Sequence, residues 1–156
     1  MILVVVASFL TCDVNATWIT IDNIIYDVAG DTAIVYSGKS CSGAVVIPGS
    51  ITCNGENYRV TTIGELAFDG CSWLEKVYCK AKTPTNNIGA YSFNLGWRDI
   101  TLYVPIGSKD AYASANQWRF FNPIIEMDFS IKGDIDGDES VGVSDVTALI
   151  SMILAQ

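Results

Sequence analysis

The chain has 156 residues, of which half are hydrophobic and 17% are charged, so the composition predicts a globular protein with room for one ordinary domain. Histidine is absent, which removes the commonest general base and metal ligand near neutral pH and argues against an enzyme. The net charge is −8, concentrated between Glu126 and Asp145, so a basic surface for nucleic acid is not expected.

The first residues predict an export signal. Residues 2–10 are an uninterrupted apolar run that is too short to span a bilayer. Val14-Asn15-Ala16 then supplies the small-residue pattern of a signal-peptidase site, although no basic residue precedes the run. The alternative is a buried strand. We therefore expect a signal peptide at 1–16, a secreted or cell-surface protein, and no stable membrane span in the mature chain.

Residues 17–57 predict a series of short β-strands joined by turns. Asn54-Gly55 is a strong signal for a tight hairpin between two short strands, and Pro48 ends the strand before that hairpin. The expected strands are short runs rich in β-branched and aromatic residues: 18–21, 24–28, 32–36, 43–48, 51–53 and 58–60.

One pattern is written twice, 25 residues apart, within the segment 58–128. Ile63-Gly64-Glu65-Leu66-Ala67-Phe68 recurs as Ile88-Gly89-Ala90-Tyr91-Ser92-Phe93, and Val77-Tyr78 recurs as Leu102-Tyr103. A period in the twenties is typical of a solenoid, whose units bury their apolar faces by stacking on one another. We expect Phe68 and Phe93 to be buried and stacked, with Ile63 and Ile88 beside them.

The first copy carries a family resemblance. Residues 60–77 follow the pattern V-T-x-I-G-x-x-A-F-x-G-C-x-x-L-x-x-V without departure, and they resemble the BspA-type leucine-rich repeat of bacterial surface proteins. The second copy lacks the Gly-Cys and the Leu, and we expect it to close the array. Residues 17–57 resemble the N-terminal β cap that precedes such repeats. The resemblance implies adhesion or protein binding, for example to a host surface protein. The alternative is two coincidentally similar strand-helix pieces.

Beyond a linker at 129–133, the tail 134–156 has the ligand spacing of a calcium loop. Asp134, Asp136, Asp138 and Asp145 occupy loop positions 1, 3, 5 and 12, and Ser140 supplies a backbone carbonyl at position 7. The apolar residues that follow recur on one helix face: Val146, Leu149, Ile150 and Ile153. The alternative is a solvated acidic tail.

This tail resembles one half of a type I dockerin. It departs from the family at position 6, which is Glu139, at position 9, which is Gly142, and in having no second loop and helix before Gln156. The resemblance implies calcium as the cofactor and a cohesin-like protein as the partner.

Four cysteines follow the expected cleavage point: Cys41, Cys53, Cys71 and Cys79. Cys41 and Cys53 flank one strand and are candidates for a disulfide across it, whereas Cys71 and Cys79 are expected to be free buried thiols. The four tryptophans are either core residues or sugar-stacking residues: Trp18, Trp73, Trp97 and Trp118.

The expected fold class is α+β and β-rich: a short leucine-rich-repeat solenoid with an N-terminal β cap and a C-terminal EF-hand-like loop-helix. The expected function is an exported, non-enzymatic protein-interaction or adhesion module with a calcium-binding, dockerin-like tail. The alternatives are an accessory of a polysaccharide-degrading assembly that docks through this tail, and a carbohydrate-binding domain.

Overall fold

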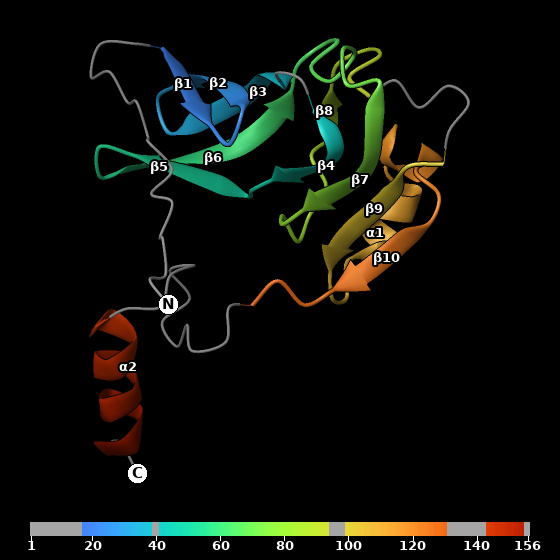
Figure 1. Cartoon of the computed structure of the whole chain (residues 1–156). Helices are drawn as coiled ribbons and strands as arrows, with labels where there is room; N and C mark the ends of the chain where they lie inside the picture. Colours follow the sequence, from blue (N-terminus) through green and yellow to red (C-terminus); the bar gives the residue numbers. More distant parts are fainter. Residues whose placement is uncertain (1–16, 39–40, 94–98, 131–142, 155–156) are drawn as a thin grey trace, which may run out of the picture.

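A mixed sheet and an all-parallel sheet form the body of the computed structural model, which describes residues 17–38, 41–93, 99–130 and 143–154 (Figure 1). The first sheet has the strand order β1-β2-β3-β6-β5, with β8 also paired to β6, and the second has the order β10-β9-β7-β4. The strands of the first sheet are β1 (Trp18–Ile21), β2 (Ile24–Ala29), β3 (Thr32–Gly38), β5 (Ser50–Cys53), β6 (Glu56–Ile63) and β8 (Asn87–Ile88). The strands of the second are β4 (Ser42–Ile47), β7 (Trp73–Cys79), β9 (Thr101–Pro105) and β10 (Ile124–Met127).

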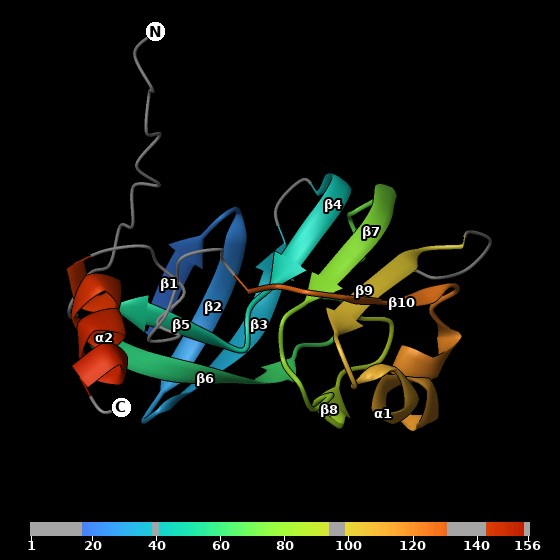
Figure 2. The same ribbon diagram turned by 90° about the horizontal axis from the view of Figure 1, so that it is seen from below.

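The helical segments lie in the C-terminal part of the chain. They are α1 (Lys109–Ser114), the 3-10 turn η1 (Trp118–Phe120) and α2 (Val143–Leu154). Seen from below, the strands of the two sheets run side by side, with α1 at the end near β9 (Figure 2). In Figure 1, α2 stands apart from both sheets.

Tight turns join the antiparallel strands as the sequence predicts. Asn54 and Gly55 both have positive φ, 52° and 82°, in the hairpin between β5 and β6. Asp22 and Asn23 also have positive φ, 48° and 63°, in the turn between β1 and β2. Asn, Asp and Gly tolerate this conformation, and two consecutive positive φ values match the twist of a hairpin.

The two copies of the repeated pattern lie beside one another in parallel register. Ile63 pairs with Ile88, and Phe68 forms an isolated parallel bridge with Phe93. In the second sheet β7 pairs with β9, so that Val77 faces Leu102 and Tyr78 faces Tyr103. All these pairs are 25 residues apart, so the spacing correctly predicted which residues stack.

The same turn follows the glycine in both copies. The Gly64 N–H donates to the Val35 carbonyl at 2.7 Å, and the Gly89 N–H donates to the Ile63 carbonyl at 2.8 Å. A Cβ at Gly89 would lie 2.3 Å from the Glu65 nitrogen, so only glycine fits there. The left-handed residues of the turn are Leu66 and Tyr91, with φ of 57° and 53°.

The chain is strand-rich, but the predicted fold class, a leucine-rich-repeat solenoid with a β cap and an EF-hand-like loop-helix, is wrong. Only two copies stack, and both sheets continue into strands that belong to neither copy. The antiparallel pairs β1–β2, β2–β3 and β5–β6 build most of the first sheet, so it is mixed rather than a stack of equivalent coils. The calcium loop was predicted at residues 134–145, of which 134–142 lie outside the described residues.

Aromatic side chains cover the open end of the second copy. The Phe68 and Phe93 rings stack with centroids 5.0 Å apart, and Phe121 meets Phe93 edge-on at 5.0 Å. Trp118 is fully buried and donates its indole N–H to the Thr85 carbonyl at 2.9 Å. This cluster encloses apolar surface that a third copy would cover in a longer array.

The helix α1 begins at Lys109, and its first N–H groups are not capped by the side chain of the preceding residue, Ser108. Ser108 is buried and makes no side-chain capping bond. Instead Glu126 Oε1, from β10, accepts hydrogen bonds from the N–H groups of Gly107 and Lys109, both at 3.0 Å. A carboxylate suits this position because it satisfies free N–H groups at the positive end of the helix.

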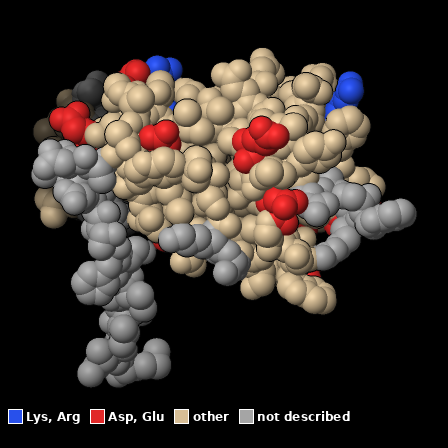
Figure 3. Space-filling view, turned by 90° about the horizontal axis from the view of Figure 1, so that it is seen from above, with Lys and Arg blue, Asp and Glu red and all other residues tan. Residues whose placement is uncertain are grey.

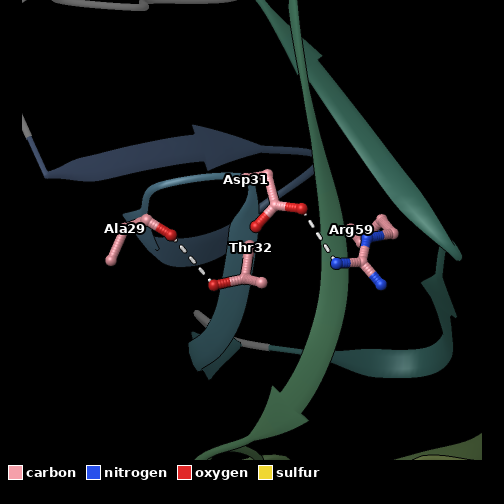
Figure 4. A network of polar contacts seen from close by, with 4 residues as sticks. All are labelled: Ala29, Asp31, Thr32 and Arg59. Carbon is pink, nitrogen blue, oxygen red and sulfur yellow. Dashed lines mark hydrogen bonds and ion pairs between the residues drawn. The ribbon is translucent and has the colours of Figure 1, made fainter.

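A polar contact on the surface joins the parallel strands β3 and β6. Arg59 Nη2 donates to Asp31 Oδ2 at 2.8 Å, and the Thr32 hydroxyl donates to the Ala29 carbonyl at 2.9 Å (Figure 4). Both partners of the ion pair are mainly exposed. The ion pair holds the pKa of Asp31 below its usual value, through the hydrogen bond and the charge of Arg59.

The cysteines differ in part from expectation. Cys41 is a free thiol and Cys53 is disulfide-bonded, so the suggested Cys41–Cys53 bond is not formed. Cys71 and Cys79 are free and buried, as predicted.

Candidate functional site

The predicted calcium ligands are not brought together within the part of the chain that the structure describes. Asp134, Asp136, Asp138 and Ser140 lie outside the described residues, and Asp145 lies on α2. Among the described residues, no group of three or more His, Cys, Asp or Glu side chains could hold a metal ion. The calcium site therefore stays a prediction.

The helix predicted from the apolar spacing of the tail is present as α2, which begins at Val143. Val146, Ile150 and Ile153, three of the four residues that defined its apolar face, are each more than half exposed. Exposed aliphatic residues at this spacing form a stripe that can pack against another surface.

A second exposed surface crosses the four-stranded sheet as one continuous row, here called the outer row. The register pairs Val46 with Tyr78, Tyr78 with Tyr103, and Tyr103 with Ile125. Val46 is 43% exposed and Ile125 is 39% exposed, while the two tyrosines are half-buried. The neighbouring row, Val45, Val77 and Leu102, is buried because successive strand residues point to opposite faces.

The two tyrosines at the centre of the outer row support each other. Their rings stack with centroids 4.6 Å apart and planes inclined by only 12°. In this arrangement each ring covers one face of the other. The row contains no charged side chain, and Trp73, which is 73% exposed, lies on the same strand as Tyr78.

The sequence revealed the centre of this row but not its ends. Val77-Tyr78 and Leu102-Tyr103 were recognised as repeated strands. Val46 and Ile125 belong to β4 and β10, which are not part of the repeat, so no spacing linked them to the tyrosines. Only the parallel pairing of the four strands places them in line.

The surface charge is sparse and mainly acidic on the face seen from above. Figure 3 shows uncharged residues over most of this face, with acidic groups scattered across it and basic groups near its edges. Such a face lacks the clustered positive charge that binds a nucleic acid backbone.

A small apolar cavity of about 220 Å³ lies beneath Trp118, lined by Ile47, Val60, Ile63, Cys79, Ala81 and Thr85 among others. Next to it the Tyr112 hydroxyl lies 2.7 Å from the Ala81 carbonyl and 3.1 Å from Cys79 Sγ. Burial raises the pKa of the Cys79 thiol, and burial also raises the pKa of Tyr112. Both groups therefore stay neutral near pH 7, so this thiol is not an activated nucleophile.

A more polar cleft of about 320 Å³ lies between the β1–β2 turn and β4. Its lining residues are Asp22, Asn23, Ile24, Cys41, Ser42, Ala44, Val45 and Val46. Asp22 is the only charged residue among them, so the cleft does not present the paired acid and base of a hydrolytic site.

Within the described residues, no helix combines the length and apolar character needed to cross a bilayer. Comparisons with protein-family models, with curated proteins and with solved structures find no match to this chain. The surfaces of this chain that bear on its function are the outer row and the exposed face of α2.

Proposed function

We propose that this protein is an exported, non-enzymatic interaction module that binds another protein through the outer row. The observation that carries the proposal is the uninterrupted exposed line of Val46, Tyr78, Tyr103 and Ile125 across four paired strands. Tyrosine with flanking aliphatic residues is the composition typical of the centre of a protein interface. The BspA-like sequence of residues 60–77 supports the same conclusion, because proteins with that repeat serve adhesion.

A protein partner is favoured over a sugar by the geometry of the tyrosines. Sugars stack on open aromatic faces, but Tyr78 and Tyr103 turn their faces toward each other. The edges and aliphatic neighbours that remain suit an apolar protein surface, whose side chains can pack between them. Exposed Trp73 keeps a carbohydrate-binding domain as the second candidate, because its ring is 73% exposed on the same strand.

The experiment inserts a charge into the outer row. Val46→Lys and Ile125→Lys place an ammonium group among apolar contacts, and we expect each to weaken partner binding at least tenfold. Ile106→Lys is the matched control because Ile106 is exposed but follows β9, outside the row. The effect is measured by cross-linking each variant to whole cells and comparing the intensity of the same cross-linked protein band.

Loss of the band with the two row variants, and its retention with Ile106→Lys, would support the proposal. An equal band for all variants would contradict it. Binding to a glycan array that is abolished by Trp73→Ala and not by Ile125→Lys would establish the carbohydrate alternative instead.

The tail is proposed as a second, calcium-dependent contact. Asp134, Asp136, Asp138 and Asp145 with the carbonyl of Ser140 would supply the oxygen ligands, and the cation would offset the repulsion among the carboxylates. Gly142 offers no ligand at position 9, so we expect a dissociation constant of roughly 10⁻⁵ to 10⁻³ M. The exposed stripe of α2 would then dock on a cohesin-like protein, as in assemblies that degrade polysaccharides.

Calorimetric titration of the whole chain with calcium tests this contact, with Asp134→Ala as the control. Heat of binding that disappears in the variant would support the site. A flat titration of the unaltered chain would contradict it and leave the tail a solvated acidic segment, without bearing on the outer row.

A further inference from the structure

Two free thiols meet beside Gly38, at the junction of the two sheets. Cys41 immediately precedes β4, and Cys71 lies two residues before β7. The pairing of β4 with β7 begins at Ser42 and Trp73, so the two cysteines flank the first rung of one parallel ladder. Adjacent strands are about 4.8 Å apart, which falls within the Cα separation that a disulfide spans.

The surroundings of Gly38 show how close the sulfurs come. The Cys71 thiol donates to the Gly38 carbonyl at 3.9 Å. A Cβ built on Gly38 would lie 2.6 Å from Cys41 Sγ and 2.5 Å from the Phe68 ring. Glycine at this position therefore leaves room for Cys41 Sγ to reach the same small space as Cys71 Sγ. The two thiols are close enough for Cys71 to influence the titration of Cys41.

One thiol of the pair is open to solvent and the other is not. Cys71 is buried, whereas Cys41 is half-buried and lines the cleft of about 320 Å³ between the β1–β2 turn and β4. A small disulfide can therefore reach Cys41 through the cleft, and Cys71 lies behind it, placed to resolve the product.

We propose that Cys41 and Cys71 are a dithiol site that a low-molecular-weight disulfide, such as oxidised glutathione, converts into an intramolecular disulfide. The Cys41 thiolate attacks one sulfur of the oxidant and releases one glutathione thiolate. The Cys71 thiolate then attacks Cys41 Sγ and releases the second. The protein loses two protons and two electrons in total, and the oxidant is reduced to two glutathione thiols.

The reduced pair persists near neutral pH for a physical reason. Burial, and then the contact with Cys71, raises the pKa of the Cys41 thiol to about 12. The nearby Asp22 carboxylate lines the same cleft and adds negative charge to it. Little thiolate is present at pH 7, so exchange is slow and mildly alkaline conditions accelerate it.

The bond would tie the start of β4 to the turn that precedes β7. It would close a loop that contains β4, β5, β6 and the first copy of the repeat. Closing a loop of this length restricts the unfolded chain, so oxidation should raise the melting temperature by on the order of 10 °C.

The test incubates the whole folded chain with oxidised glutathione at mildly alkaline pH, followed by alkylation and peptide mapping by mass spectrometry. We expect a cross-linked peptide joining Cys41 to Cys71, reversed by dithiothreitol. Cys79 serves as the internal control, because its thiol is buried beside Tyr112 rather than beside another described cysteine, and it should remain free.

Two variants separate the steps. Cys71→Ala should stop at a stable mixed disulfide of glutathione on Cys41, and Cys41→Ser should leave Cys71 unmodified. A stable glutathione adduct on Cys41 in the unaltered chain, with no cross-link, would overturn the proposal. So would an unchanged rate of thiol loss in Cys41→Ser, or a cross-linked form that melts no higher than the reduced one.

Discussion

The two copies of the repeated pattern have the same backbone but different neighbours. In both copies the glycine N–H donates a hydrogen bond to a carbonyl of the segment stacked before it. In both, the residue two positions later, Leu66 or Tyr91, has a positive φ. The first copy is enclosed by β3 on one side and by the second copy on the other. The second copy is covered by Trp118 and Phe121 instead.

This difference separates what the repeat specifies from what its surroundings supply. The shared residues set the turn and the stacking distance. A residue that the copies do not share links them: Ser92 stands where the first copy has Ala67, and its hydroxyl lies 2.7 Å from the Gly64 carbonyl and 2.6 Å from the Gly89 carbonyl. A hydroxyl thus links the two copies where the first copy needs only a methyl group.

The largest expected effect comes from truncating the stacked phenylalanines. Phe68→Ala and Phe93→Ala should each lower the free energy of unfolding by about 3–5 kcal/mol, because a cavity is left in the core. We expect Phe68→Ala to lie at the upper end, since Phe68 is 1% exposed and Phe93 is 6% exposed. Urea unfolding measures both, and an unchanged midpoint for Phe68→Ala would refute the role of the stack.

The covering of the second copy is tested at Trp118. Trp118→Phe keeps a ring but removes the indole N–H that bonds to Thr85, leaving a partly buried carbonyl without this donor. We expect a loss of about 1–3 kcal/mol in urea unfolding. Phe120→Leu is the matched control because Phe120 lies in the same turn but is mainly exposed, and it should change stability little. Equal losses for the two variants would argue against Trp118 as the cover.

The link between the copies is tested at Ser92. Ser92→Ala gives the second copy the residue of the first and removes a fully buried hydroxyl, which should cost about 1 kcal/mol. Ser114→Ala is the control, because Ser114 also donates to backbone carbonyls but is exposed on α1. If both variants had the same stability as the unaltered chain, the hydroxyl would not link the copies.

The smallest effect is expected outside both copies, at the ion pair of Asp31 and Arg59. The folded-state pKa of Asp31 is depressed, so its contribution to stability is present above the unfolded-state value of about 3.9 and is lost as pH falls through the folded-state pKa. Arg59→Ala should therefore be slightly less stable than the unaltered chain at pH 7 and indistinguishable from it once the pH has fallen below the folded-state pKa of Asp31. Arg119→Ala is the control. The Arg119 guanidinium lies over the uncharged Phe120 ring, so the effect of this substitution should not follow the titration of Asp31. A difference between Arg59→Ala and the unaltered chain that grows as pH falls would contradict the assignment.

Local features were predictable from the sequence because their signals are local. β1 has the predicted bounds, the Asn54-Gly55 hairpin is present, and the spacing of 25 residues predicted the pairs Phe68–Phe93 and Tyr78–Tyr103. The positive φ of Leu66 and Tyr91 was not predictable, since neither residue type favours that conformation.

Long-range pairing was not predictable for the same reason. Nothing in the sequences of β4 or β10 indicates that these strands extend the sheet of the repeat. The sequence therefore indicated only the two tyrosines of the outer row, and the predicted fold class was wrong. The hydrogen bonds that cap α1 come from Glu126, 17 positions after Lys109, and no local pattern indicates this residue. The predicted calcium ligands Asp134, Asp136, Asp138, Ser140 and Asp145 remain a prediction.

The central claim, that the two copies stabilise each other by stacking, is tested most directly by a double-mutant cycle on Phe68 and Phe93. The rings lie 5.0 Å apart and nearly parallel, which predicts a coupling free energy of about 0.5–1.5 kcal/mol, so that the double variant loses this much less stability than the sum of the two single losses. The free energies of unfolding of Phe68→Ala, Phe93→Ala and the double variant give this value. Additive losses, within about 0.3 kcal/mol, would show that the copies are independent and contradict the account.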